Sequence, residues 1–281
     1  MTFPLRLRLA ALLWAIAAFG VGPSVARAQE EVPFVTSPDN VTLEMLRIAD
    51  VGPGDHVIDL GSGDGRIVIL AAKRFGASGL GVEIVPHLVR ESERNARDAG
   101  VANRVSFKEQ DLFQTDLSTA TVVTMYLLPQ VNLQLRPALL ALRPGTRLVS
   151  HDWDMADWKP DRTVTVSVPD KKVGLDKSSQ VHLWVVPARV AGLWCGEGLL
   201  TGASLDLAQH YQAFEGTLRH RERSRPVAGR IAGDILRAAG GKAGELVLQV
   251  QGGQLRILAA AGPLALAQGM GFHRAPGERC G

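Results

Sequence analysis

Cysteine is scarce in this chain, and its thiols are spaced too far apart for a zinc or dithiol motif. The 281 residues include two cysteines, Cys195 and Cys280, and no C-x-x-C pair. The sequence therefore lacks the signature of a structural zinc site or of a thioredoxin-like redox site. In an oxidising compartment the two thiols could pair and close the C-terminal part of the chain, or stay apart, because spacing alone does not supply the geometry of a disulfide.

The chain also lacks a strong charge of one sign once its N-terminus is set aside. Residues 1–28 hold three of the 31 basic residues and none of the 28 acidic ones, so the remainder carries equal numbers of each. Such a balance gives no argument for nucleic acid as a partner. The locally basic stretch Arg219–Arg225, RHRERSR, is interpreted as a solvated loop, because runs of charge usually are.

The N-terminal apolar run is too short to cross a bilayer comfortably. It extends over residues 9–21, whereas a spanning helix needs about 20 residues. The run follows Arg6 and Arg8 and precedes Ala26-Arg27-Ala28, which is the order of a secretory signal peptide with an A-x-A cleavage site. We predict a signal peptide over residues 1–28, a periplasmic or secreted location, and no stable membrane span after cleavage. An uncleaved anchor is the alternative.

From residue 29 to about residue 187, strand-like and helix-like segments alternate. Apolar runs rich in β-branched residues predict strands, and helical periodicity with proline starts or glycine ends predicts the helices between them. The alternation indicates an α/β fold with a doubly wound, mainly parallel, seven-stranded Rossmann-like sheet whose last two strands form an edge hairpin. The predicted strands are 55–60, 79–84, 104–108, 120–127, 146–151, 163–168 and 181–186, and the helices are 66–75, 86–99 and 133–141, after one that begins near Ser37.

After residue 187 the alternation of strand-like and helix-like segments ends, and residues 188–281 are predicted to form a small β-rich C-terminal domain. Short strands are expected at 204–208, 245–251 and 254–258, the last two joined across Gly252-Gly253. Residues 231–241 could equally be a helix. This domain either packs against the sheet edge and stabilises it, or docks a protein substrate or a cell-envelope partner.

The chemistry begins with a glycine-rich turn after the first predicted strand. The segment Val57–Arg66, VIDLGSGDGR, has the pattern G-x-G-x-G, with Asp59 before it and Asp64 inside it. Glycines let the backbone approach a ligand closely, and the N–H groups at the start of the following helix point toward it. A P-loop would need Lys-Ser or Lys-Thr after the last glycine, where this chain has Arg66-Ile67. Two carboxylates would repel a pyrophosphate, whereas beside a cation they are favourable.

Two further acids follow later strands and narrow the ligand class. Glu83 ends the second strand, where its carboxylate can accept both hydroxyls of a ribose, and Asp111 follows the third strand, within reach of an adenine amine. A ligand with an amino-acid head, a ribose and an adenine but no phosphate fits these acids. That ligand is S-adenosylmethionine (SAM).

These ordered pieces resemble the seven-stranded, class I SAM-dependent methyltransferases, and within them the group related to the mitochondrial protein-lysine N-methyltransferases. The resemblance covers about residues 33–187. It rests on PFVTSP at 33–38, DLGSGDGRIVILAA from Asp59, GVEIVP around Glu83, the Asp111 segment and YLLP at 126–129. The opening segment VTSP lacks an additional proline that the resemblance leads us to expect.

The resemblance implies a role for each matching residue. It assigns Asp59, Gly61, Gly63 and Gly65 to the methionine end of the cofactor, Glu83 to the ribose and Asp111 to the adenine. It places Thr36 and Pro38 in a segment that closes over the cofactor, and Tyr126–Pro129 along the transfer site. Asp111 as a loop cap and Tyr126 as a core residue are the plainer alternatives.

The end of the fifth strand supplies candidate groups for the transfer step. His151 and Asp152 fall on the active face of the sheet and are predicted, with Tyr126, to line the site. The alternative is that Asp152 caps the following turn and that His151 is a satisfied surface histidine. A metal site made by these two residues with Asp154 lacks support from any other ligand at suitable spacing, so no metal is predicted.

The predicted function is methyl transfer from SAM to an acceptor, which the resemblance implies is a protein lysine amine. One alternative is a small-molecule methyltransferase with a closed apolar acceptor pocket. A second is a non-catalytic SAM-binding module of the cell envelope, because SAM is made in the cytoplasm and the signal peptide directs the chain away from it.

Overall fold

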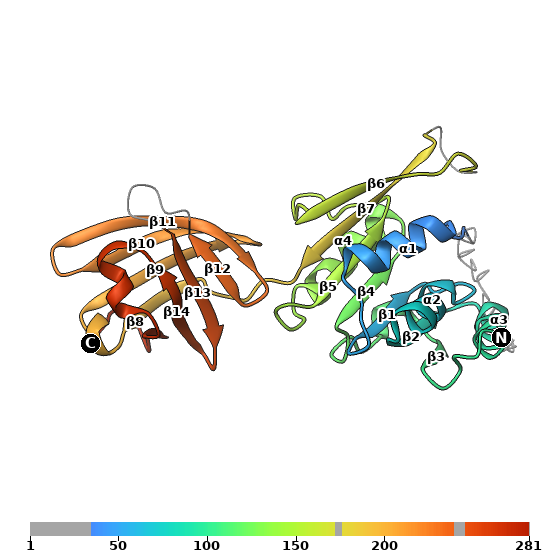
Figure 1. Ribbon diagram of the computed structural model, residues 1–281, viewed down its shortest axis with the longest axis horizontal. Helices are drawn as coiled ribbons and strands as arrows, with labels where there is room; N and C mark the ends of the chain where they lie inside the picture. Colours follow the sequence, from blue (N-terminus) through green and yellow to red (C-terminus); the bar gives the residue numbers. More distant parts are fainter. Residues whose placement is uncertain (1–34, 172–175, 239–244, 281) are drawn as a thin grey trace, which may run out of the picture. The chain divides into compact units, whose positions relative to one another are not determined.

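The computed structural model describes residues 35–171, 176–238 and 245–280, which comprise a sheet part and a β-barrel (Figure 1). The predicted signal peptide lies outside the described residues. No helix in the described segments is long and apolar enough to cross a membrane. The sheet part contains α1 (Asp39–Ile48), β1 (His56–Leu60), α2 (Arg66–Phe75), β2 (Ser78–Glu83), α3 (Pro86–Asp98), β3 (Val105–Glu109), η1 (Leu112–Gln114), β4 (Val122–Met125), α4 (Pro129–Leu139), β5 (Arg147–His151), β6 (Arg162–Ser167) and β7 (Ser178–Val185).

The sheet has seven strands in the order β3-β2-β1-β4-β5-β7-β6. Strands β1 to β5 run parallel, while β7 is antiparallel to both β5 and β6. The predicted doubly wound, mainly parallel fold with an edge hairpin is therefore confirmed. The order reverses between β1 and β4, and in open α/β sheets a ligand binds beyond the carboxyl ends of the strands at such a switch point.

Both faces of the sheet are apolar and covered, which explains why its strands read as continuous hydrophobic runs. Successive residues of a strand point to opposite faces. Val57 packs in the cluster that contains α1 and α2 residues such as Met45 and Val68, whereas Ile58 packs in the cluster beneath α4 that contains Trp158 and Trp184.

Helix α4 begins earlier than its periodicity predicts. The prediction was residue 133, but the helix starts at Pro129, with Leu128 in an extended conformation as the N-cap residue. Proline is favourable at the first helical position because its missing N–H needs no partner there. Strand β4 ends at Met125, so Tyr126–Leu128 form a short link between strand and helix instead of extending the strand.

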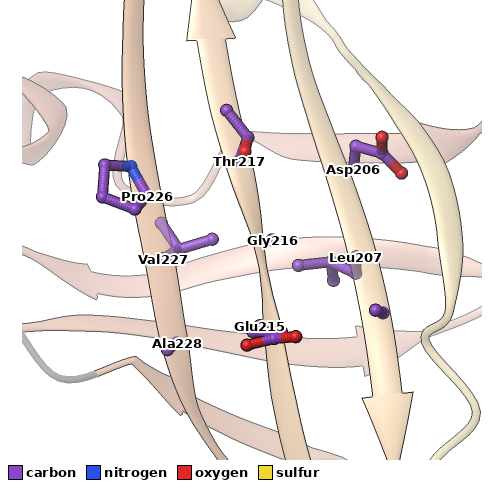
Figure 2. A pocket seen from close by; sticks show the side chains of 9 residues that line it. Asp206, Leu207, Glu215, Gly216, Thr217, Pro226, Val227 and Ala228 are labelled. Atoms are coloured by element: carbon purple, nitrogen blue, oxygen red, sulfur yellow. The ribbon is translucent and has the colours of Figure 1, made fainter.

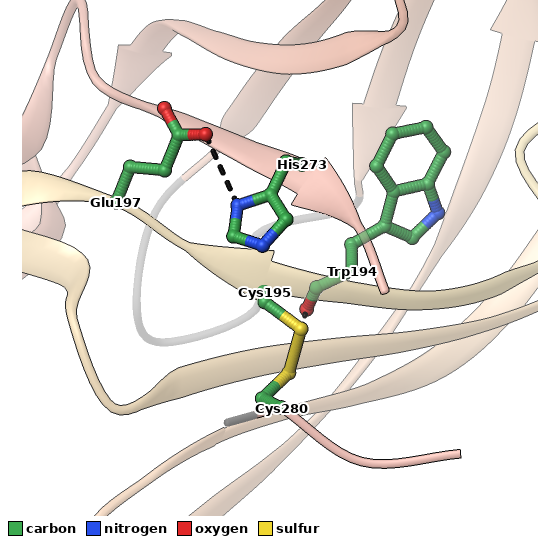
Figure 3. Close-up of a disulfide and its surroundings, with 5 residues drawn as sticks. All are labelled: Trp194, Cys195, Glu197, His273 and Cys280. Carbon is green, nitrogen blue, oxygen red and sulfur yellow. Dashed lines mark hydrogen bonds and ion pairs between the residues drawn. A yellow bond between two sulfur atoms is a disulfide. The ribbon is translucent and has the colours of Figure 1, made fainter. Parts of the chain in front are cut away.

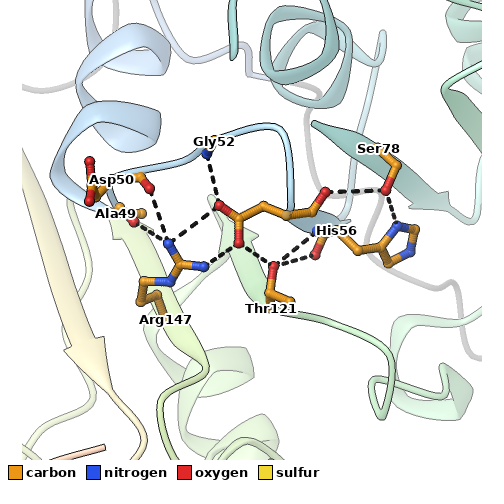
Figure 4. A network of polar contacts seen from close by, with 8 residues as sticks. Ala49, Asp50, Gly52, His56, Ser78, Thr121 and Arg147 are labelled. Carbon is orange, nitrogen blue, oxygen red and sulfur yellow. Dashed lines mark hydrogen bonds and ion pairs between the residues drawn. The ribbon is translucent and has the colours of Figure 1, made fainter. Parts of the chain in front are cut away.

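A polar network fixes the amino edge of the sheet, opposite the switch point (Figure 4). The Asp55 carboxylate accepts hydrogen bonds from Gly52 N (2.8 Å) and Thr121 Oγ1 (2.7 Å) and pairs with Arg147. Burial raises the pKa of Asp55, but the hydrogen bonds from Thr121 and Arg147 outweigh it and leave the pKa below the usual value. Arg147 also donates to Ala49 O (2.8 Å), so the network joins α1, β1 and β5.

The C-terminal part is a closed antiparallel barrel in the order β10-β11-β12-β13-β14-β15-β8-β9, which confirms the predicted β-rich domain. Alternate residues of each strand fill its interior, among them Trp194, Phe214 and Phe272. Its elements are β8 (Gly192–Gly196), η2 (Gly198–Leu200), β9 (Ala203–His210), β10 (Ala213–His220), β11 (Arg223–Ala232), β12 (Ile235–Ala238), β13 (Leu246–Gln251), β14 (Gln254–Ala260), η4 (Gly262–Ala267) and β15 (Gly271–Arg274).

Two sequence interpretations of this part are wrong. The alternative of a helix at 231–241 fails in its described portion, because Ile231 lies within β11 and residues 235–238 form β12. The basic stretch 219–225 is solvent-exposed from Arg219 to Ser224, as predicted, but instead of a loop it forms the tip of the β10–β11 hairpin, with His220 paired to Arg223 across the turn.

A disulfide between Cys195 and Cys280 fastens the C-terminal segment to β8 (Figure 3). Of the two possibilities that the sequence left open, the structure has the paired one. Beside it, the ring of His273 lies 3.0 Å from the Glu197 carboxylate, and the Arg274 guanidinium lies 4.4 Å from the Trp194 ring centroid.

Candidate active site

The predicted site residues lie after neighbouring strands at one edge of the sheet. Leu60 pairs with Val82 on one side and with Met125 on the other, and Met125 pairs with Ser150. The glycine turn and Tyr126 follow β1 and β4, and Glu83 and His151 are the last residues of β2 and β5. The topology alone therefore brings all of them to one edge at similar heights.

The turn after β1 requires its glycines. Gly61, Gly63 and Gly65 all have positive φ (72°, 54° and 80°), a region that side chains other than glycine rarely adopt. At Gly65 a Cβ would also stand 2.6 Å from the Phe107 ring. Helix α3 holds the turn from behind, since Ser92 Oγ donates to Gly63 O (2.8 Å). The turn thus consists of bare backbone that is held in a left-handed conformation.

Glu83 is almost fully buried, with 9% of its surface exposed. One carboxylate oxygen accepts from Gly63 N (2.9 Å), and the other accepts from Ile84 N (2.8 Å) and Val85 N (3.0 Å). The acid predicted to bind the ribose is thus tied to the glycine turn itself, so its position and the shape of the turn depend on each other.

Asp59 lies beneath the turn and is 2% exposed. Burial raises the pKa of its carboxyl to about 7, with smaller contributions from the charges of Glu83 and Asp64, although a hydrogen bond from Thr124 Oγ1 (2.6 Å) works in the opposite direction. A buried carboxyl with a pKa near 7 is only partly ionised at neutral pH. A cationic ligand beside it favours the ionised form, so the two stabilise each other.

Asp64 does not act as a second free carboxylate in the turn, contrary to what the sequence suggested. Its side chain is paired with Arg66, whose Nη2 lies 2.7 Å from Oδ2 and whose Nε donates to Oδ1 at 3.0 Å. Arg66 Nη1 in turn donates to Ser37 O (2.9 Å). The basic residue after the turn is therefore used to fix the N-terminal segment and offers no charge to a phosphate.

The segment 35–38 joins the site through Ser37, and Thr36 beside it is half-buried. Ser37 Oγ lies 2.8 Å from His151 Nδ1, which connects this segment to the end of β5. Asp111 accepts a hydrogen bond from Phe113 N (2.9 Å), which is the cap that the plainer alternative describes. Its other carboxylate oxygen has no hydrogen bond from the described residues, so capping and a contact with a ligand are compatible.

His151 is not a surface histidine, as the plainer alternative had it, because only 1% of it is exposed. Its ring nitrogens lie 2.8 Å from Ser37 Oγ and 2.9 Å from Ser179 Oγ, and its ring stacks on Tyr126 at 3.9 Å between centroids. Burial lowers the pKa of His151 to about 4, so the ring is neutral at pH 7. Burial also raises the pKa of Tyr126, with a smaller effect from the charge of Asp152.

Asp152 is held by contacts with the β6–β7 hairpin and does not cap the turn that follows it. It accepts from Lys171 Nζ (2.8 Å) and from Gln180 N (2.9 Å), and its backbone has a positive φ of 61°. The cap of the following turn is Asp154, which accepts from Ala156 N. No group of three or more His, Cys, Asp or Glu side chains in the described segments is arranged to hold a metal.

Asn132 is a site-edge residue that the sequence reasoning missed. It is completely buried, and its amide nitrogen donates to Ser150 Oγ and Trp153 O, both at 3.2 Å. Its Oδ1 and the Oγ of Ser62 in the glycine turn have no hydrogen-bond partner in the described residues. The predicted helix began at residue 133 and left Asn132 outside, whereas α4 begins at Pro129 and includes it.

The residues present fit SAM. The left-handed glycine turn gives close backbone approach, Glu83 and Asp59 supply acid groups, and the one basic side chain next to the turn is neutralised by Asp64. This chemistry suits a cationic, phosphate-free ligand and disfavours a nucleotide phosphate.

Comparison with known proteins agrees with this assignment. The family description that matches, over residues 59–162, is the ANTKMT methyltransferase domain. A protein-lysine N-methyltransferase from Saccharolobus islandicus is 46% identical over 137 residues, which cover 48% of this chain and 85% of that protein. The mouse adenine nucleotide translocase lysine N-methyltransferase is 33% identical over 46% of this chain and 57% of its own length.

A solved structure is similar over the same part. It is the RNA methyltransferase from Salinibacter ruber in complex with S-adenosyl-L-homocysteine, 50% identical, with a TM-score of 0.50 over 56% of this chain and 96% of that one. The matches in sequence agree with the strand order and with the geometry of the site. The chain belongs to the class I SAM-dependent methyltransferases, in the group related to the protein-lysine N-methyltransferases.

Proposed function

We propose that this methyltransferase acts on lysine side chains of proteins. The observation that carries the proposal is the 46% identity to a protein-lysine N-methyltransferase over most of that relative's length. We further propose that Asp59 and Glu83, with the backbone of Gly61–Gly65, hold the methionine and ribose parts of SAM, that Asp111 holds the adenine and that Thr36 covers the cofactor.

The protein's own contribution is alignment and exclusion of water. When bound, SAM supplies an electrophilic methyl carbon, which a neutral lysine nitrogen takes with its lone pair as the carbon–sulfur bond breaks. Buried Asp59 and Glu83 make the site electrostatically favourable for positive charge. Holding two reactants in line in this way accounts for a large share of an enzymatic rate.

The link after β4 supplies the acceptor side. Leu128 and Trp153 remain 39% and 43% exposed at this edge, and the apolar stem of a lysine packs well on such side chains. Tyr126 lies beside them, fixed by its stack on His151. Since both nitrogens of His151 already have serine partners, we assign it a positioning role, and the lysine proton leaves to water.

We also propose that residues 1–28 are removed on export and that the enzyme works outside the cytoplasm. The N-terminal pattern supports this proposal. The mass of the chain recovered from a periplasmic fraction tests it, because the proposal requires an N-terminus at Gln29.

The first experiment is calorimetric titration of SAM and of S-adenosylhomocysteine into the chain from Gln29, beside Glu83→Ala. Micromolar binding that weakens at least a hundredfold in the variant supports the cofactor site. Glu93→Ala, a change of an exposed acid on α3, is the matched control and should bind as the wild type. No binding by the folded wild type contradicts the proposal.

Acceptor class is tested next with labelled SAM and three substrates, namely envelope proteins, total RNA and a small-molecule extract. Label on lysine residues, located by mass spectrometry, supports the proposal. Label on RNA or on small molecules contradicts it, and cofactor binding without transfer to any of the three indicates a binding module.

A further inference from the structure

The barrel has two ends, and the strand registers show which connections share each of them. Ala203 at the start of β9 pairs with His220, and Arg223 at the start of β11 pairs with the same His220. The η2 segment before β9 and the β10–β11 turn therefore lie at one end. Strand β14 finishes at this end too, followed by η4, because its last residue pairs with Leu246 beside the end of β12. We call this the η2/η4 end.

The opposite end contains the β9–β10 and β11–β12 turns and is already occupied. Tyr211 Oη donates to Asp157 (2.9 Å), its ring stacks on Trp158, and Gly233 O accepts from Ala188 N (2.7 Å). These contacts tie it to residues of the sheet part and its linker. Among the described residues, no hydrogen bond, ion pair or ring contact of this kind joins the η2/η4 end to the sheet part.

Two leucines project from the η2/η4 end. Leu199 in η2 is 68% exposed and Leu266 in η4 is 83% exposed, the largest values among the exposed large apolar side chains of the described residues. Leu199 N lies 3.3 Å from the sulfur of Met270, which follows η4, so the two segments are neighbours. These two largely exposed leucines have no role in the barrel core, which is filled by other residues.

Arginines surround the same end. Arg219, Arg221 and Arg223 are all exposed at the tip of the β10–β11 hairpin, where Glu222 is the one acid. Glu197, close to η2, is a second acid at this end, and its carboxylate lies 3.0 Å from His273 Nδ1. The outer wall differs, since the shallow pocket across β9, β10 and β11 is lined by Asp206 and Glu215 (Figure 2). Positive charge is thus concentrated at the end that also carries the leucines.

We propose that the η2/η4 end docks on an anionic phospholipid surface, with Leu199 and Leu266 entering the interface and the hairpin arginines contacting lipid phosphates. Apolar tips beside basic residues are the combination that holds a peripheral protein at a charged bilayer. Nucleic acid fits less well, because single strands bind on exposed aromatic side chains. The barrel's described aromatics Trp194, Phe214 and Phe272 are buried, and Tyr211 is at the other end.

The test is co-sedimentation of the chain from Gln29 with vesicles of phosphatidylcholine alone or mixed with phosphatidylglycerol. Residues 1–28 are omitted because their apolar run would bind lipid by itself. The proposal expects binding to the mixed vesicles that falls with added salt, and at least tenfold weaker binding to neutral ones. Absence of binding to the mixed vesicles overturns it.

Two variants separate the charge from the apolar contribution. Arg219→Gln/Arg221→Gln/Arg223→Gln should lower the affinity at least tenfold, since each basic residue near an anionic surface contributes about fivefold. The matched control, Arg90→Gln/Arg94→Gln/Arg97→Gln, removes the same charge from exposed positions of α3 and should bind almost unchanged. Equal losses in both triple variants overturn the assignment to this end.

Leu199→Ser/Leu266→Ser should also weaken vesicle binding at least tenfold at unchanged net charge. Unaltered binding of this variant overturns the insertion of the leucines. An RNA oligonucleotide that competes with the vesicles for wild-type chain but does not itself depend on the leucines would point to nucleic acid instead and overturn the proposal. Vesicle binding is measured without any methyl acceptor, so the result does not depend on the proposed lysine specificity.

Discussion

The sheet part and the barrel are similar in being well packed, but they differ in what they bury. Of the buried polar or charged side chains in the described residues, all except Gln212 belong to the sheet part, and they include Asp59, Glu83, Asn132 and His151 at its carboxyl edge. The barrel interior is apolar and its closure is reinforced by a disulfide. Burial of a polar group lowers stability unless it is fully bonded. The sheet part thus buries the polar groups of its candidate site, whereas the described polar side chains of the barrel, apart from Gln212, are at least partly exposed on its surface.

The largest effect that sharpens this comparison is expected from the disulfide. Cys195→Ser/Cys280→Ser opens a covalent link that spans 85 residues, and loss of that constraint should lower the stability of the barrel by about 4 kcal/mol. Thermal unfolding followed by the fluorescence of the intrinsic tryptophans measures it. SAM affinity should stay the same, and a parallel loss of SAM binding would show that the two parts do not separate in this way.

The next effect concerns the amino edge of the sheet. Arg147→Leu leaves the Asp55 carboxylate, whose side chain is 12% exposed, without its cation, and this should lower the free energy of unfolding by about 3 kcal/mol. Denaturant titration measures the loss. Since the network lies at the edge opposite the glycine turn, the SAM dissociation constant should change less than about twofold, and a larger change would refute the division of the sheet into a structural edge and a functional edge.

Asp59 gives a pH-dependent test of the functional edge. Its folded pKa of about 7 lies above the ordinary value of 3.8, so the folded state binds more protons than the unfolded state between these values. Stability from this group is therefore present below pH 3.8 and is lost as the pH rises to about 7. Asp59→Asn should remove that slope and raise the stability at pH 8, where the wild type has lost this contribution.

The same variant should bind SAM more weakly, because the cation favours ionised Asp59. In the wild type, affinity for SAM should rise as the pH increases through about 7, and in Asp59→Asn it should stay level. Calorimetry at several pH values decides the matter. A wild-type affinity that is independent of pH would mean that Asp59 does not sense the charge of the cofactor.

The smallest effect compares two glycines with positive φ. Gly252→Ala in the β13–β14 turn meets no atom within 4 Å and should cost about 1 kcal/mol of backbone strain. Gly65→Ala adds a clash with Phe107 to the same strain, so its cost should be about twofold larger, and it should also weaken SAM binding. Equal losses in denaturant titration would indicate that Phe107 moves aside.

The sequence predicted the sheet well because its strands are buried on both faces and read as continuous apolar runs. Glu83 and the glycines could be placed because the carboxyl ends of parallel strands meet at one edge. The pairing of Asp64 with Arg66 could not be predicted, since a spacing of two residues does not show which way either side chain turns. The burial of His151 could not be predicted either, because it depends on Ser37 and Ser179 from distant segments.

The barrel was harder to predict because its strands have one face in water. Strand β10, AFEGTLRH, has only two buried side chains, Phe214 and Leu218, and its charged end resembles a loop. Pairing with β9 on one side and with β11 on the other makes the segment extended, and such pairing is not visible in local sequence.

The closure of the barrel also decides how copies of this chain can associate through their backbones. A closed ring of strands presents no row of unpaired N–H and C=O groups, whereas the open sheet has two edges, β3 and β6. Among the described strands, addition of a strand from another molecule is therefore restricted to those two. Of these, β6 has alternating exposed threonines and serine and forms, with β7, the hairpin that holds Asp152, so a partner that lengthened the sheet there would be added to the hairpin that contacts the candidate site.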